Sequence, residues 1–186
     1  MCQASRGEVY MDESTPPLGD HMPFVDFDAA AHALLAWLQG RLGFALWAVT
    51  ALEDGHHRVR VAIDERYDVA PGNHYAWLDA YCSQALAGAP PIAWDRRAVP
   101  AYADLPGPPD APVLAFAAVL LCRSDGTVGG MLCAAEPLPL LPEVADEAPL
   151  LALMGRVLST LDAWWGAQGD AAGVRTAVTR GRDSTE

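Results

Sequence analysis

The sequence predicts a single α+β domain built around a mostly antiparallel sheet. Two apolar runs, 113–121 and 128–135, are joined by a short turn that contains Asp125-Gly126. A second pair of strand-like runs lies between residues 44 and 64. Apolar residues at helical spacing stand before these strands and after them, which adds helices to the sheet.

Composition supports one folded domain. The chain has 186 residues, 52% of them hydrophobic, and a mean hydropathy of +0.11, which is enough to bury a core. We expect the domain to span residues 24–168, between a flexible leader (1–23) and a disordered tail (169–186) that carries few apolar side chains.

Charge and hydropathy exclude several classes of partner. The formal net charge is −12, so a phosphate backbone would be repelled and nucleic-acid binding is not expected. No apolar run approaches the ~18 residues of a membrane span, and the N-terminus does not resemble a signal peptide. We therefore expect a cytoplasmic protein. All 12 basic residues are Arg, and this composition is typical of a GC-rich bacterial genome.

The first half of the chain predicts a helix, two strands and a second helix. Apolar residues from Phe27 to Leu42 recur at helical spacing, with Asp26 or Asp28 near the start and Gly40 or Gly43 near the end. Strands follow at 44–52 and 57–64, around a turn at Glu53-Asp54-Gly55. In the second strand Val59, Val61 and Ile63 alternate with Arg58, Arg60 and Ala62, which predicts one solvated face.

The middle of the chain predicts a short helix beneath a long cover. Residues 77–86 form the helix, which ends at Gly88, and a short strand follows at 91–94. The Pro-rich segment 99–112 comes next, and loops of this length are typically lids or mobile covers.

The second hairpin has a predicted register. A two-residue type I′ turn at Asp125-Gly126 places Ala118 opposite Cys133 and Cys122 opposite Gly129. The thiols of Cys122 and Cys133 then lie roughly 13 Å apart along the strands, which is too far for a disulfide. The four cysteines show no zinc-site spacing and are expected to be free thiols.

After the hairpin, three prolines exclude a helix until about residue 143. The last helix then carries one broad apolar stripe that ends in Trp164-Trp165. The stripe residues are Leu150, Leu153, Met154, Val157, Leu158, Leu161, Trp164 and Trp165.

Three segments resemble the GAF family of small-molecule and redox sensor domains, as found in bacterial signalling proteins. They are residues 43–50 (GFALWAVT), residues 77–83 (WLDAYCS) with Val99-Pro100-Ala101-Tyr102, and the second hairpin ending in MLCAA at 131–135. The resemblance implies a central antiparallel sheet of five to six strands. It places the first and last helices on one face, often as a dimer interface, and a short helix and long loop over the other face.

The resemblance also implies a ligand cavity under the middle helix and the loop. Aromatic residues gather in this part of the sequence, as ligand pockets require, although such residues also build ordinary cores. The expected ligand-binding residues are Trp47, His74, Trp77, Tyr81, Cys82, Trp94, Tyr102, Phe116 and Cys133.

The sequence also bears on thiol catalysis, cofactor binding and recognition of a polar ligand. One GAF branch reduces free methionine sulfoxide with cysteines. Cys82 matches one of them, but the loop position of the reactive cysteine falls in residues 101–104, which hold no cysteine. His74 is a possible haem ligand, and the cysteine context for a bilin is absent, so the cofactor is left unknown. Asp95-Arg96-Arg97 and Asp104 either orient a polar ligand or form a solvated turn.

These observations favour a non-catalytic sensor of an unidentified small molecule or redox signal, with no metal site and no catalytic residues assigned. Its terminal helices would signal to a second copy or to a partner protein. Two alternatives remain: a thiol-dependent reductase of a small oxidised substrate, and a structural dimerisation module.

Overall fold

The computed structural model describes residues 24–163, and its architecture is the predicted α+β fold. The sheet has five strands in the order β2-β1-β5-β4-β3, and every neighbouring pair is antiparallel. The strands are β1 (Leu46–Glu53), β2 (His56–Asp64), β3 (Ile92–Ala93), β4 (Ala115–Cys122) and β5 (Val128–Glu136). The predicted leader, the tail and Trp164-Trp165 lie outside the described residues.

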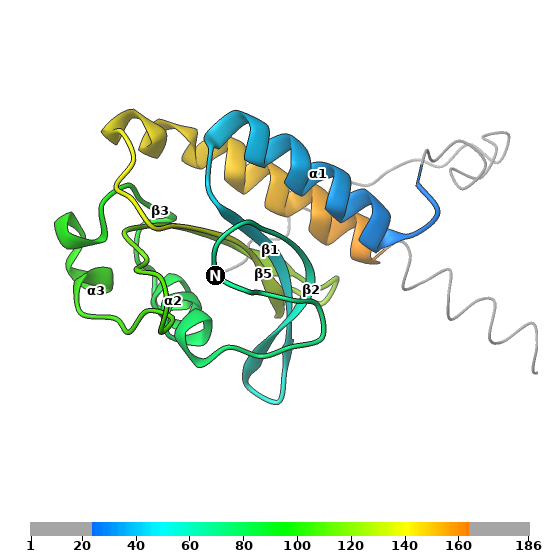
Figure 1. The fold of residues 1–186 in the computed structure, drawn as a ribbon. Helices are drawn as coiled ribbons and strands as arrows, with labels where there is room; N and C mark the ends of the chain where they lie inside the picture. Colours follow the sequence, from blue (N-terminus) through cyan, green and yellow to red (C-terminus); the bar gives the residue numbers. More distant parts are fainter. Residues whose placement is uncertain (1–23, 164–186) are drawn as a thin grey trace, which may run out of the picture.

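Helices cover both faces of the sheet. On one face α1 (Phe27–Leu42) lies beside the C-terminal helix (residues 148–163), which follows the 3-10 helix η3 (Pro142–Glu147) (Figure 1). On the other face lie α2 (Ala76–Leu86), the short α3 (Pro100–Ala103) and η2 (Arg96–Ala98), a 3-10 helix of one turn. This arrangement of layers agrees with the prediction.

Each face carries its own hydrophobic cluster. The cluster under α1 and the C-terminal helix includes Leu35, Leu38, Trp47 and Leu151. The cluster under α2 and α3 contains most of the buried aromatic rings and both free thiols, and it is called the aromatic cluster below. Its buried members are Ala45, Leu46, Ala48, Val59, Tyr67, Val69, Trp77, Leu78, Tyr81, Cys82, Ala93, Tyr102, Val113, Phe116, Ala118, Met131, Cys133 and Ala135.

The ends of α1 are set by two residues that the sequence singled out. Asp26 is the N-cap, and its carboxylate accepts a hydrogen bond of 2.8 Å from the backbone N–H of Ala29. Gly43 is the C-cap and adopts a left-handed conformation (φ +72°), which glycine reaches at little cost. Asp28 and Gly40 therefore are not the caps.

The β4–β5 hairpin has the predicted register over most of its length. Seven pairs agree, including Ala118 opposite Cys133. The predicted type I′ turn is wrong, because Gly126 (φ +82°) has a positive φ and Asp125 does not. The N–H of Gly126 donates to the carbonyl of Arg123, so the turn has three residues and the pairing beside it shifts by one. Cys122 therefore pairs with Val128, not with Gly129.

The β1–β2 hairpin has the turn that was expected in the other hairpin. Asp54 and Gly55 both have positive φ, +50° and +83°. A bulge between Val49 and Thr50 leaves Arg60 as the extra residue of β2. The predicted single alternation along β2 is therefore wrong: Val59 joins the aromatic cluster, whereas Val61 packs on the α1 face.

The C-terminal helix only partly follows the predicted stripe. Leu158 is buried, but so is Leu151, which the stripe omitted, while Leu153 and Val157 are exposed. Of the cysteines, Cys82 and Cys133 are free, and Cys122 is disulfide-bonded, which corrects the expectation of a free thiol there. Among the described residues, no helix has the length and apolar character of a membrane span.

Candidate functional site

The nine residues expected at a ligand site fall into separate groups. Six of them meet in the aromatic cluster: Trp77, Tyr81, Cys82, Tyr102, Phe116 and Cys133. Trp47 lies in the other cluster, where its ring contacts that of Phe44 (5.3 Å between centroids). Trp47 cannot line a cavity under α2, because β1 presents it to the opposite face. Trp94 belongs to neither cluster, and its carbonyl accepts a hydrogen bond from Leu140.

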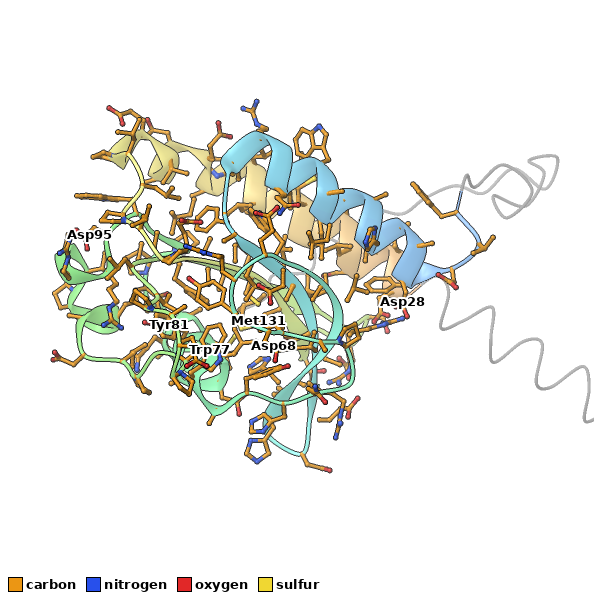
Figure 2. All side chains as sticks on the ribbon, in the orientation of Figure 1. Asp28, Asp68, Trp77, Tyr81, Asp95 and Met131 are labelled. Carbon is orange, nitrogen blue, oxygen red and sulfur yellow. The ribbon has the colours of Figure 1, made fainter. Side chains whose placement is uncertain are left out.

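The aromatic cluster consists of rings in direct contact. Tyr81 on α2 lies 4.8 Å from Phe116 on β4 and 6.0 Å from Tyr102 on α3, measured between ring centroids. Trp77 lies one turn before Tyr81 on the same helix, and Figure 2 shows both on the same side of the sheet as Met131. A ligand that enters among these rings must therefore displace some of them or lift the cover formed by residues 99–112.

Arg96 brings a cationic group to the edge of this cluster. Its Nη1 donates to the hydroxyl of Tyr81 (2.7 Å) and to the carbonyl of Leu105 (2.8 Å) in the cover. Its Nε is buried without a hydrogen-bond partner among the described residues. The guanidinium therefore has one N–H group that no acceptor within residues 24–163 satisfies, and a buried donor without a partner is costly.

Arg97 differs from its neighbour. Its guanidinium is exposed and forms a two-pronged ion pair with Asp95, with donor–acceptor distances of 2.9 and 2.7 Å. The same pairing lowers the pKa of Asp95. The sequence treated the two arginines as one ligand-orienting pair or one solvated turn. In the structure Arg97 fits the solvated turn, whereas Arg96 turns toward the aromatic cluster.

Few hydrogen bonds hold the cover on the domain. The hydroxyl of Tyr67 donates to the carbonyl of Pro112 (3.1 Å), and that of Tyr102 donates to Pro90 (3.0 Å). Burial raises the pKa of Tyr102 to about 12, and the pKa of Tyr67 also rises because of burial. Both hydroxyls therefore stay protonated at neutral pH and act as donors.

The two free thiols of the cluster are buried. Cys82 on α2 faces Cys133 on β5, whose Sγ lies 3.6 Å from the carbonyl oxygen of Ala48. The hydrogen bond to Cys133, together with burial, raises the pKa of Cys82 well above its usual value. Nucleophilic cysteines have lowered pKa values, so Cys82 has the character of a structural thiol.

The structure also brings together a polar group that the sequence treated as separate residues. His56 at the start of β2, His74 in the loop before α2, and Asp79 on α2 meet at the surface, and they are called the histidine–aspartate cluster below. Oδ2 of Asp79 accepts from Nδ1 of His56 (3.0 Å) and from Nε2 of His74 (2.5 Å). Oδ1 of Asp79 accepts from the backbone N–H of His57 (2.7 Å). His74 was expected at the ligand site, but its ring bonds to Asp79.

The electrostatics of this cluster follow from burial and hydrogen bonding. Burial acts to raise the pKa of Asp79, but hydrogen bonds from His57, His56 and His74 outweigh it and hold the pKa below its usual value. His57 is itself buried, with Nδ1 3.1 Å from the hydroxyl of Thr50 and Nε2 without a partner in the described part of the chain. Burial lowers the pKa of His57.

Hollows on the described part of the surface lie outside the expected site. An open depression of about 570 Å³ is lined by residues 43–45, 65–66 and 136–138 together with Gln39. A smaller one, about 40 Å³, lies beside Phe27, Arg60 and the β4–β5 turn. None of the nine predicted residues lines either hollow.

No protein-family model and no curated protein matches this chain. Solved structures do match it. A GAF domain from an Acinetobacter phosphoenolpyruvate-protein phosphotransferase aligns with a TM-score of 0.55 and 14% identity, covering 78% of this chain and 87% of that one. The chain has a GAF-like fold.

Two further neighbours have the same fold in different contexts. The type II free methionine-R-sulfoxide reductase of Thermoplasma acidophilum aligns with a TM-score of 0.55 and 17% identity, over 75% of this chain and 94% of that one. A bacteriophytochrome from R. palustris aligns with a TM-score of 0.56 and 16% identity, over 85% of this chain but only 38% of that protein. At these identities the GAF-like fold is shared, and fold alone does not assign an activity.

Proposed function

We propose that this protein is a non-catalytic sensor whose GAF-like domain binds a small monocarboxylate with an apolar or aromatic body. The ligand would enter between α2 and the cover, with its carboxylate on Arg96 and its body against Tyr81 and Tyr102. Binding would favour one position of the cover and one packing of the sheet, and the terminal helices would transmit the change.

The unpartnered Nε of Arg96 carries this proposal. Guanidinium groups bind carboxylates through two parallel N–H donors, and Arg96 has an unused donor beside its Nη groups. The neighbouring rings supply the apolar wall that ligand sites require. A ligand with several negative charges is disfavoured by the net charge of −12.

The fold neighbours support small-molecule recognition. They include chromophore-binding domains of bacteriophytochromes, one GAF-like structure with bound biliverdin, and a reductase of free methionine-R-sulfoxide. Each of these neighbours binds or reduces a small molecule, and the fold alone does not identify the ligand of this chain.

The terminal helices are the proposed output. They lie on the face of the sheet opposite the aromatic cluster, and the strands of the sheet carry side chains into both hydrophobic clusters. Trp37 on α1 and Leu153 and Val157 on the C-terminal helix are exposed large apolar residues. Such residues favour pairing with a second copy or with a partner protein.

A thermal-unfolding screen of carboxylate metabolites tests the proposal. A ligand present at a hundred times its dissociation constant should stabilise the protein by ~2.7 kcal/mol. Arg96→Gln should abolish that stabilisation, while Arg97→Gln, which alters the exposed neighbour, should leave it intact. Equal stabilisation of both variants would show that Arg96 does not bind the carboxylate.

The alternatives make different predictions. The reductase is supported by the Thermoplasma neighbour and by Cys82, but the buried, high-pKa thiol weighs against it. Thioredoxin-linked reduction of free methionine sulfoxide that disappears in Cys82→Ser and Cys133→Ser would favour the reductase. A structural dimerisation module predicts a stable dimer that no metabolite stabilises.

A further inference from the structure

We propose that His56, His74 and Asp79 form a binding site for one divalent transition-metal ion of the zinc type. The site is separate from the proposed carboxylate site, which rests on Arg96, and nothing in the proposed sensor function requires it. The inference starts from the three side chains and their spacing.

The ligand atoms are close enough to share one ion. Nδ1 of His56, Nε2 of His74 and a carboxylate oxygen of Asp79 all lie within 4.8 Å of one another. Zinc bonds to nitrogen and oxygen are ~2.1 Å long, so tetrahedral ligands lie roughly 3.4 Å apart. To share an ion, the two imidazoles need to approach each other by at most about 1.4 Å. Their nitrogens, now 3.0 and 2.5 Å from Oδ2 of Asp79, also need to move away from that oxygen by up to about 0.9 Å, and exposed side chains can make both shifts by small rotations.

The carboxylate is already oriented for this role. The backbone N–H of His57 holds Oδ1 of Asp79, which leaves Oδ2 directed toward both imidazoles. This is the arrangement by which outer hydrogen bonds orient a metal-binding carboxylate. Each neutral imidazole would bind the ion through the nitrogen that now contacts Asp79 and carry its proton on its other ring nitrogen.

The three residues are positioned by the fold and not by one flexible loop. His56 follows the Asp54-Gly55 turn at the start of β2, and Asp79 lies in the first turn of α2. His74 is held by an antiparallel bridge to Arg58, and Val59 donates to the carbonyl of Asn73 beside it. Ligands fixed by separate elements lose little freedom when an ion binds.

The donor set selects the class of ion. Two imidazoles and one carboxylate suit Zn²⁺, Cu²⁺, Ni²⁺ or Fe²⁺, whereas Mg²⁺ and Ca²⁺ prefer sites built from oxygen. Three protein ligands leave one tetrahedral position open to water or another small ligand. A bound ion would also tie the β1–β2 hairpin to α2, the helix that carries Tyr81.

The test is a calorimetric titration of Zn²⁺ into the full chain after treatment with a chelator. We expect one Zn²⁺ per chain with micromolar or tighter affinity, and at least tenfold weaker binding by His56→Gln and by His74→Gln. Both side chains are exposed, so circular dichroism should show that these variants remain folded. Mg²⁺ in place of Zn²⁺ should give no measurable binding.

A matched control uses a histidine away from the cluster. His32→Gln should bind Zn²⁺ as the wild type does, because His32 on α1 does not belong to the cluster. In the wild-type chain Zn²⁺ should also protect His56 and His74, but not His32, from chemical modification of the imidazole. A loss of less than tenfold in either cluster variant, or equal modification with and without Zn²⁺, would overturn the site.

Discussion

His57 makes the folded protein sensitive to mild acid. The side chain is 2% exposed, its Nδ1 bonds to Thr50, and burial holds its pKa below the ordinary value of 6.5. The unfolded chain therefore binds a proton at a higher pH than the folded chain does. The contribution of neutral, buried His57 to stability is complete above pH 6.5, and it is lost as the pH falls from there toward the pKa of His57 in the folded state.

The size of the effect follows from proton linkage. One group that is protonated only in the unfolded state changes the free energy of unfolding by about 1.4 kcal/mol per pH unit. Because burial lowers the pKa of His57 in the folded state, the loss develops below pH 6.5 and stops growing once the folded state is protonated as well. One pH unit at this slope is a sizeable share of the ~5–15 kcal/mol stability of a typical domain.

Urea unfolding at several pH values, followed by circular dichroism, measures this slope. His57→Asn keeps a polar atom near the Nδ1 position but does not titrate, so its stability should fall less steeply between pH 6.5 and pH 5. His32→Asn alters an exposed histidine and should keep the wild-type slope. Equal slopes for wild type and His57→Asn would refute the reasoning.

Three other substitutions, two of them with a control substitution, test a close backbone contact, a helix cap and the core. Gly130→Ala would place Cβ 1.8 Å from the backbone oxygen of Thr50 and should lower the free energy of unfolding by about 3 kcal/mol or more. In the control Gly129→Ala the new Cβ meets only the flexible side chain of Arg123, so the loss should be far smaller. Urea midpoints measure the difference, and similar midpoints for the two variants would contradict the prediction. Asp26→Ala removes the α1 cap and should lower the free energy of unfolding by about 1 kcal/mol. An unfolding curve identical to that of the wild type would disprove this. Leu38→Ala opens the core under α1 and should cost about 2–5 kcal/mol, against less than about 0.5 kcal/mol for the exposed Leu138→Ala in the same assay.

Local patterns predicted much of the fold. The helical spacing after Phe27, with Asp26 before it and Gly43 after it, located α1 because caps and apolar stripes depend on nearby residues. The hairpin register also came from local information, since an Asp-Gly turn restricts the pairing of its flanking strands. The GAF-like arrangement was implied by the resemblance of three sequence segments to that family, and the structure has this fold.

The details that failed depend on interactions across the chain. Arg60 is displaced into a bulge where it pairs with Asp28 and Asp162 and lies over the ring of Phe27, and no pattern within β2 indicates this. The bulge turns Val61 to the other face of the sheet. Likewise, the first five residues of β1 are all buried, so its sequence has no alternation that could show that Trp47 faces α1 and not α2.

Six of the nine residues expected at a ligand site lie together in the aromatic cluster, because α2 and the central strands each present one face to the other. Their role in ligand binding stays a prediction. The inward turn of Arg96 and the meeting of His56, His74 and Asp79 come from segments far apart in the sequence. His56 and His57 are neighbours in the sequence, and the packing of α2 against β2 buries the second ring and leaves the first exposed.

Native mass spectrometry of the wild type and of Arg96→Gln, each incubated with the carboxylate that stabilises the wild type, tests the sensor proposal most directly. The proposal predicts that the wild-type spectrum shows one bound molecule per chain and that the Arg96→Gln spectrum shows none. Identical spectra for the two proteins, with the molecule bound to both or to neither, would contradict recognition of a carboxylate by Arg96 beneath the cover.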